Sequence, residues 1–324
     1  MPLRLALLVL IVAGLLPAPA QAALRDLAED WSPEPLPVIA LALIGLAYTA
    51  GIIRLLGRAK SGGIVVASRI GAMFIGIAAL AAALASPLDA LADRRLSAHM
   101  AQHLLLMMVA APALVWARPT LALIWVFPRG VRQTLGRAWN TMAAPRIAPT
   151  LQRPATAWIL FCGSLAFWHL PLMYRWALES ESRHALMHLS FLGAGMLFWS
   201  IVIEPSRKRR LDLGRTILFV FSAAVVAGLP GAVLTFARTP IYHSATPLMP
   251  TGMTALEDQQ LAGLLMWIPM DLELFAVAAA LFAVWLLEMD RRQRAPSGDG
   301  ATVAPTPLSL EAAEDCGSRL PSHY

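Results

Sequence analysis

Apolar residues are gathered along this chain into long runs, which are separated by shorter polar stretches. Several runs reach about twenty residues, the length that a helix needs to cross a bilayer. Since backbone polar groups in lipid must be paired within the segment, such runs predict α-helices. We therefore expect an all-α, polytopic membrane helix bundle with about seven transmembrane helices, at roughly 36–56, 64–86, 102–126, 156–172, 184–203, 215–236 and 261–286.

The N-terminal run has a different pattern. A short basic start, "MPLR", precedes the apolar stretch "LALLVLIVAGLL" and the segment "PAPAQA", which predicts a signal peptide cleaved after Ala22. An uncleaved first helix is the alternative. The C-terminal residues are rich in Pro, Ser, Gly and acidic side chains, which is typical of disorder. We expect a signal peptide at 1–22, a seven-helix transmembrane domain at 23–290 and a disordered cytoplasmic tail at 291–324.

Two of the apolar runs contain residues that interrupt helices. The sequence "GLPG" at 228–231 predicts a kink or break. Pro269 interrupts the last run, which also carries Asp271 and Glu273. Carboxylates are costly in lipid and are often functional. These two could belong to an ion path or bind a partner helix, and the sequence favours neither.

Composition and charge support a membrane protein and indicate its orientation. Apolar residues make up 58% of the chain and charged residues only 14%, well below the roughly 25% of a soluble domain. The basic pI then reflects loop arginines rather than nucleic-acid binding. Counted by alternate loops, 17 basic residues fall on one side of the predicted bundle and six on the other. The positive-inside rule places the first side in the cytoplasm, with the mature N-terminus outside and the C-terminus cytoplasmic.

Several classes of chemistry have no support in the sequence. The two cysteines, Cys162 and Cys316, form neither a CxxC motif nor a c-type haem attachment motif. The sequence shows no activated nucleophile, no Gly-rich phosphate loop and no basic nucleic-acid patch. An enzyme is therefore not expected.

Histidines provide the strongest functional pattern. The segment "SAHMAQHLLLMM" carries His99 and His103, and "HALMH" carries His184 and His188. Residues four apart share a helix face, so each pair can reach one metal ion. The predicted topology puts both pairs, together with His169 and His243, at the extracytoplasmic face. A lone histidine there would be solvated, but paired imidazoles suit copper or zinc.

Two further side chains extend this candidate site. Met107 lies four residues beyond His103, and a thioether favours Cu(I), although core filling is the alternative. Asp258 opens the last run from the outer side. It could cap that helix or orient a ligating histidine. The predicted metal site thus comprises seven residues, namely His99, His103, Met107, His169, His184, His188 and Asp258.

These segments together resemble a known family. "HMAQHLLLMMVAAPAL", "FWHLPLMYRWAL", "HALMHLSFLGAGMLFW", "GLPGAVLTFARTPIY" and "DQQLAGLLMWIP" are similar to the multi-spanning CtaG-type cytochrome c oxidase assembly factors. The resemblance implies a multi-pass protein of the bacterial inner membrane that serves maturation of haem-copper oxidase in the respiratory chain, at copper delivery. Its motif histidines fall on His99, His103, His169, His184 and His188, and its acidic position falls on Asp258. Asp271 and Glu273 depart from the more apolar stretch expected in relatives.

We therefore expect an assembly factor that binds copper transiently, with the oxidase subunits as partner, membrane lipid around it and no contact with nucleic acid. The first alternative is a haem- or quinone-binding redox protein. Against haem, each histidine pair lies within one helix, so its members cannot ligate opposite faces of one iron. The second alternative is a metal transporter, in which Asp271, Glu273 and "GLPG" would form a broken-helix path.

Overall fold

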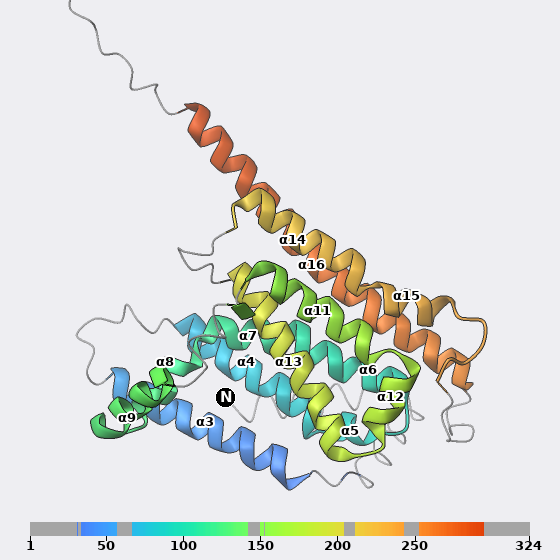
Figure 1. The fold of residues 1–324 in the computed structure, drawn as a ribbon, viewed down its shortest axis with the longest axis horizontal. Helices are drawn as coiled ribbons and strands as arrows, with labels where there is room; N and C mark the ends of the chain where they lie inside the picture. The colour runs from blue at the N-terminus through green and yellow to red at the C-terminus, as the bar shows by residue number, and fades with distance from the viewer. Residues whose placement is uncertain are drawn as a thin grey trace, which may run out of the picture. The chain divides into compact units, whose positions relative to one another are not determined.

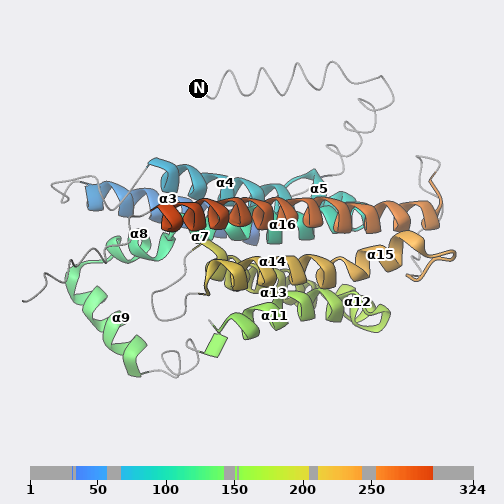
Figure 2. The ribbon, with the colours of Figure 1, turned by 90° about the horizontal axis from the view of Figure 1, so that it is seen from above.

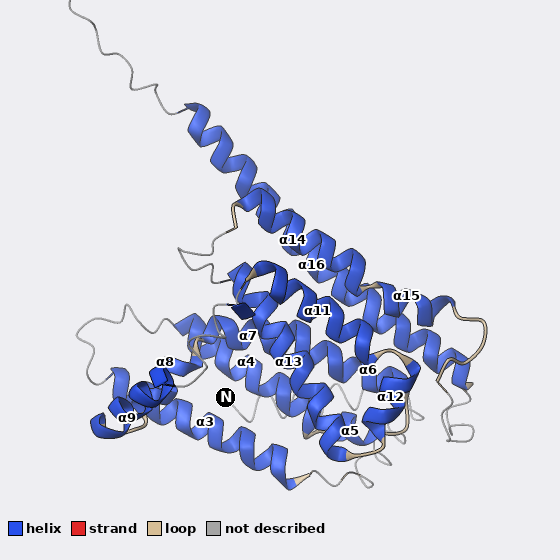
Figure 3. Cartoon of the chain, in the orientation of Figure 1, coloured by secondary structure: helices blue, strands red, loops and turns tan. Residues whose placement is uncertain are grey.

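Helices form all of the regular secondary structure in the part of the chain that the structure describes (Figure 3). The structure is a computed structural model, which describes residues 31, 34–56, 67–141, 150–151, 153–203, 211–242 and 253–294. The predicted all-α class is thus confirmed. The predicted signal peptide, His243, Cys316 and the tail beyond 294 lie outside the described residues.

The described helices, in chain order, have the following bounds (Figure 1). They are α3 (Pro35–Leu56), α4 (Ala67–Leu84), α5 (Pro87–Ala92), α6 (Leu96–Leu104), the π-helix η1 (Leu105–Ala110), α7 (Ala111–Ala117), α8 (Pro119–Trp125), α9 (Arg129–Thr141), α11 (Pro154–Trp168), α12 (Pro171–Leu178), α13 (Glu181–Ile203), α14 (Leu213–Ala227), α15 (Leu229–Phe236) and α16 (Ala255–Arg294). The chain divides into two units, Met1–Trp285 and Leu286–Tyr324, and the second includes the last turns of α16.

Among the described residues, six helical segments are long and apolar enough to cross a membrane. A seventh is counted if α11 and α12, which are bent by 79° at a short break, form one span. This agrees with the predicted polytopic bundle of about seven spans. The six are Pro35–Leu55, Ala67–Leu84, Leu96–Ala117, Glu181–Ile203, Leu213–Phe236 and Ala255–Gln293.

The third span begins and ends earlier than the predicted 102–126. It starts at Leu96 and stops at Ala117, because Arg118 adopts the left-handed conformation (φ 48°, ψ 58°). Pro119 follows, and a proline disfavours α-helical geometry at the residue before it. The chain therefore turns at Arg118 and begins α8 as a separate short helix. As a consequence, His99 lies in the first turn of the span and His103 one turn further along it.

The two predicted interruptions have different outcomes. At "GLPG", α14 ends at Ala227 and α15 starts at Leu229, so the predicted break is confirmed. At Pro269 the prediction is wrong, because α16 continues through the proline. A proline removes one backbone hydrogen bond, which tertiary packing in a membrane bundle can tolerate. Gly228 packs closely there, since a Cβ atom on it would lie 2.8 Å from the Trp267 ring.

The third span packs against two neighbours. Its segments η1 and α7 contact α4 and also α13. A Cβ atom on Gly195 would lie 3.0 Å from the Ala111 methyl group, so this glycine permits a close approach of α13. The third span therefore joins two buried clusters, one that includes Phe161 and Phe198 and one that includes Tyr48 and Met73.

The short helices mark the two ends of the first unit. α5 and α12 lie toward one end, and α8 and α9 lie toward the other (Figure 2). Since α5 leads directly into α6, the histidines of α6 lie at the α5 and α12 end.

Candidate metal centre

Helix α6 carries the first histidine pair. His99 is in its first turn and His103 in its last, so the two rings share one face, with centroids 4.4 Å apart. Their exposed fractions are 1% and 3%. The four-residue spacing thus places two imidazoles side by side in the bundle interior, as the sequence predicts.

Helix α13 carries the second pair against the first. The rings of His184 and His188 lie 4.3 Å apart, with His188 buried and His184 half-buried. His184 stacks on His99 with centroids 5.1 Å apart, and His188 lies 5.4 Å from His103. The two helices therefore gather four imidazoles into one cluster.

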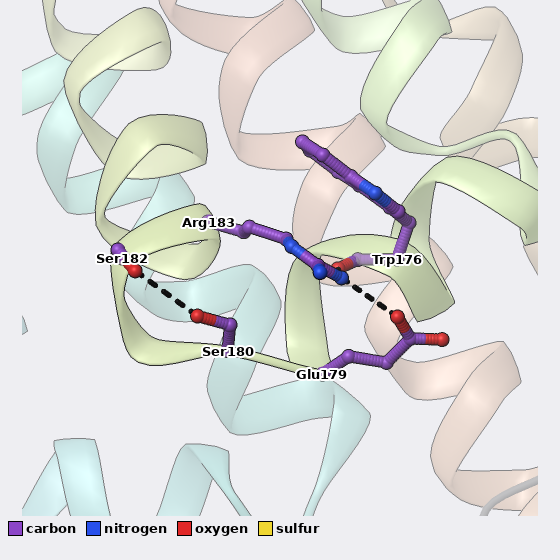
Figure 4. Close-up of polar contacts among 5 residues, drawn as sticks. All are labelled: Trp176, Glu179, Ser180, Ser182 and Arg183. Atoms are coloured by element: carbon purple, nitrogen blue, oxygen red, sulfur yellow. Dashed lines mark hydrogen bonds and ion pairs between the residues drawn. The ribbon is translucent and has the colours of Figure 1, made fainter.

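Polar contacts join the end of α12 to the start of α13 (Figure 4). The Arg183 guanidinium donates to the Glu179 carboxylate at 2.7 Å and to the Trp176 carbonyl at 3.2 Å. It also lies over the Trp176 ring, 4.8 Å from its centroid. These contacts join the end of α12 to the first turn of α13, the turn that carries His184.

Three of the imidazoles meet the distance requirement for one metal ion. His99, His103 and His188 offer nitrogen atoms that all lie within 4.8 Å of one another, and all three are buried. Five nitrogen atoms of the cluster are also buried without a hydrogen-bond partner among the described residues. They are His99 Nε2, both ring nitrogens of His103, His184 Nε2 and His188 Nε2.

This lack of partners is costly in a folded protein. Leaving a buried polar atom unpaired costs about 1–3 kcal/mol. A bound cation would satisfy the unprotonated nitrogens of several rings at once, so the donor set fits a metal such as copper or zinc. The need for a ligand is strongest at His103, since neither of its ring nitrogens has a hydrogen-bond partner in the described part of the chain.

His169 joins the cluster from the bend between α11 and α12. Its ring lies 5.9 Å from that of His103, and its Nδ1 lies 2.7 Å from the Leu165 carbonyl oxygen. Its Nε2 faces the sulfur of Met100 at 3.2 Å. The hydroxyl of Tyr242 donates to the His169 carbonyl at 2.6 Å. This histidine is thus held through both its ring and its backbone.

Met107, a predicted ligand, lies in the π-helix. α6 ends at Leu104, and η1 begins at Leu105. Met107 packs in a buried cluster, and its carbonyl accepts a hydrogen bond of 2.9 Å from the Trp199 indole. π-Helical turns are frequent at functional sites. Met100, which the sequence analysis did not select, is the methionine whose sulfur contacts an imidazole.

Asp258 reaches the cluster through the backbone of α6. Its carboxylate accepts hydrogen bonds from the N–H groups of Leu96 and Ser97, at 2.8 and 3.4 Å, and from the Ser97 hydroxyl. Arg95 occupies the N-cap position without a side-chain cap bond. Asp258 therefore caps α6, one turn from His99, and not its own helix.

Two buried glutamines complete the polar surroundings. The Gln259 side-chain carbonyl accepts from the backbone N–H of Ile241, at 2.6 Å, and of Tyr242. The Gln102 amide donates to the Ala83 carbonyl and to the Asp89 carboxylate, both at 2.7 Å. Burial raises the pKa of Asp89. Sequence reasoning missed these roles, although a glutamine within an apolar run is itself a signal of a buried polar contact.

Asp271 accepts a hydrogen bond of 2.7 Å from the Trp267 indole, and both it and Glu273 lie further along α16 than Asp258.

Membrane-length helices that bring histidines together in their interior define a polytopic membrane protein with a candidate metal-binding site. The chain belongs to the cytochrome c oxidase caa3 assembly factor family, whose model matches residues 46–288.

Three curated relatives are described as uncharacterised proteins. One from Mycobacterium leprae is 28% identical over 75% of this chain and 37% of its own length. Those from Mycobacterium bovis and Mycobacterium tuberculosis are each 28% identical over 77% of this chain and 38% of their own length. The chain thus spans a little over a third of the curated relatives it matches. No solved structure matches it.

Proposed function

We propose that this protein binds copper at the extracytoplasmic face of the inner membrane and hands it to cytochrome c oxidase subunits during assembly. The observation that carries the proposal is the nitrogen-rich cluster in which His99, His103 and His188 lie within reach of one ion. Membership of an oxidase assembly factor family supports the oxidase as the recipient of the copper. Copper is here the cargo, since haem-copper oxidases contain it.

The donor set supports copper as the metal. Imidazole binds copper and zinc well, and neither a cysteine nor a carboxylate belongs to the three-histidine group. His184 is half-buried beside His99, so the cluster has a side toward the bundle surface. A carrier must release its ion, and an incomplete set of ligands favours exchange over a closed four-ligand site.

The proposed side of the membrane rests on charge. The histidines lie at the end that carries α5 and α12, whereas α9, with Arg129, Arg132 and Arg137, lies toward the opposite end (Figure 2). Basic residues favour the cytoplasmic side. The histidine end is therefore the extracytoplasmic one, where copper would pass to the oxidase.

The experiment measures copper in this protein and in the oxidase. The full-length protein, purified in detergent, should retain copper in elemental analysis, and the double variant His99→Ala/His103→Ala should lose it. Cells that carry the double variant should contain oxidase with less copper, while the variant remains inserted in the membrane. His323→Ala, in the tail, is the matched control and should retain full loading. Normal oxidase copper content in the double variant would overturn the proposal.

A further inference from the structure

A methionine and a histidine face each other beside the three-histidine group. The Met100 sulfur and His169 Nε2 lie 3.2 Å apart, although 69 residues separate them in sequence. Met100 comes from α6 and His169 from the bend between α11 and α12. Their exposed fractions are 1% and 8%. The contact is therefore buried, and it is formed by two separate parts of the chain.

The hydrogen bond on the other side of the ring decides the state of Nε2. Nδ1 of His169 lies 2.7 Å from the carbonyl oxygen of Leu165, and a carbonyl only accepts hydrogen bonds. Nδ1 therefore carries the hydrogen atom. In a neutral imidazole Nε2 then bears a lone pair. The thioether of Met100 has no hydrogen to donate, so two lone pairs point toward each other.

A soft cation between these atoms would turn this contact into a favourable one. Thioether sulfur and imidazole nitrogen together favour Cu(I), whereas zinc sites use thiolate, imidazole and carboxylate ligands. We propose that Met100 Sδ and His169 Nε2 form a mixed sulfur–nitrogen position that makes the site selective for Cu(I). This inference rests on the proposed function and specifies the oxidation state of the copper.

The surroundings hold the pair in place. The His169 ring is fixed by Leu165, and the His169 carbonyl accepts from the Tyr242 hydroxyl at 2.6 Å. The backbone of Tyr242 in turn donates to Gln259. A ligand fixed by its surroundings binds with less loss of conformational freedom. The pair also adjoins the nitrogen-rich group, since the His103 ring lies 5.9 Å from that of His169.

The first test is a competition titration of the full-length, detergent-solubilised protein with Cu(I), under anaerobic conditions, against a chromophoric Cu(I) chelator. Met100→Leu keeps the size and apolar character of the side chain but removes the sulfur. It should weaken Cu(I) binding at least about tenfold, as loss of a supporting group does at metal sites, and leave Zn(II) binding unchanged. Met108→Leu, a buried methionine in the same span, should change neither.

The second test needs no variant. X-ray absorption of the Cu(I)-loaded wild-type protein should show a sulfur neighbour, and this test holds even if Met100→Leu fails to fold. A copper signal with nitrogen neighbours alone would overturn this inference and leave the proposed function standing. A loss of Cu(I) affinity in Met107→Leu instead of Met100→Leu would also overturn it. Failure of the wild-type protein to bind copper would overturn both.

Discussion

The Asp258 carboxylate, at the start of α16, accepts a hydrogen bond of 2.8 Å from the backbone N–H of Leu96, the first residue of α6. The two residues are 162 positions apart in the chain. A carboxylate at a helix N-terminus accepts hydrogen bonds from N–H groups that have no partner within the helix. Its negative charge also interacts favourably with the positive end of the helix dipole. Since His99 lies in the same first turn, Asp258 holds the backbone segment that carries the first imidazole.

Replacing Asp258 should therefore affect both stability and metal binding. Asp258→Ala removes the acceptor for Leu96 and Ser97, and loss of a helix cap costs about 1–2 kcal/mol. The first turn of α6 would loosen, so the metal affinity should fall as well. Thermal unfolding in detergent measures the first effect, and metal titration measures the second.

Glu257 provides the matched control for this prediction. Its carboxylate accepts from the backbone N–H and the hydroxyl of Thr254, at the start of the same helix, and it is exposed. Glu257→Ala should therefore leave the metal affinity unchanged. Equal losses of metal affinity in the two variants would show that Asp258 has no special link to the histidines.

Local spacing made part of the candidate site predictable. His99 with His103, and His184 with His188, share a face because four residues make about one helical turn. The contact between the pairs depends on how α6 packs against α13. Spacing within one helix cannot give that crossing. The sequence therefore indicated which rings belong together in each helix, and packing determined that three of them reach one position.

Other parts of the site and fold could not be predicted from the sequence, because they depend on long-range contacts or on departures from regular helix. Asp258 was recognised as a capping residue, but its partner is α6 rather than its own helix. The sequence did not indicate that Met107 would lie in a π-helix, and its role as a ligand stays a prediction. The fold class and the break at "GLPG" followed from composition and from glycine and proline. The continuity of α16 through Pro269 depends on packing that no local rule contains.

The histidines should differ in their importance for metal binding. His103 is buried, belongs to the three-histidine group and has two unpartnered nitrogens, whereas His184 is half-buried and outside that group. His103→Ala should therefore abolish retention of metal by the purified protein, and His184→Ala should weaken it by a smaller factor. Competition titrations of both variants measure the order. A greater loss in His184→Ala would place the ion nearer the start of α13.

Addition of metal should stabilise the protein, because the ion would bind the folded state alone. At a free concentration of about 100 times Kd, such binding contributes about 2.7 kcal/mol. The Tm in detergent should rise on addition of Cu(I) and fall again when a chelator removes it. His99→Ala/His103→Ala should show no such rise. A similar rise in that variant would indicate binding elsewhere on the chain.

The crossing of α15 and α16 should tolerate no added methyl group at Gly263. A Cβ atom there would lie 2.5 Å from the Thr235 hydroxyl oxygen and 2.6 Å from the Gly231 carbonyl oxygen, and backbone atoms cannot rotate away. Gly263→Ala should therefore cost about 1–3 kcal/mol and lower the Tm. Gly163→Ala is the control, since its Cβ would meet nothing within 4 Å, and its Tm should stay the same or rise slightly. An unchanged Tm in Gly263→Ala would mean that the two helices are not in close contact at this crossing.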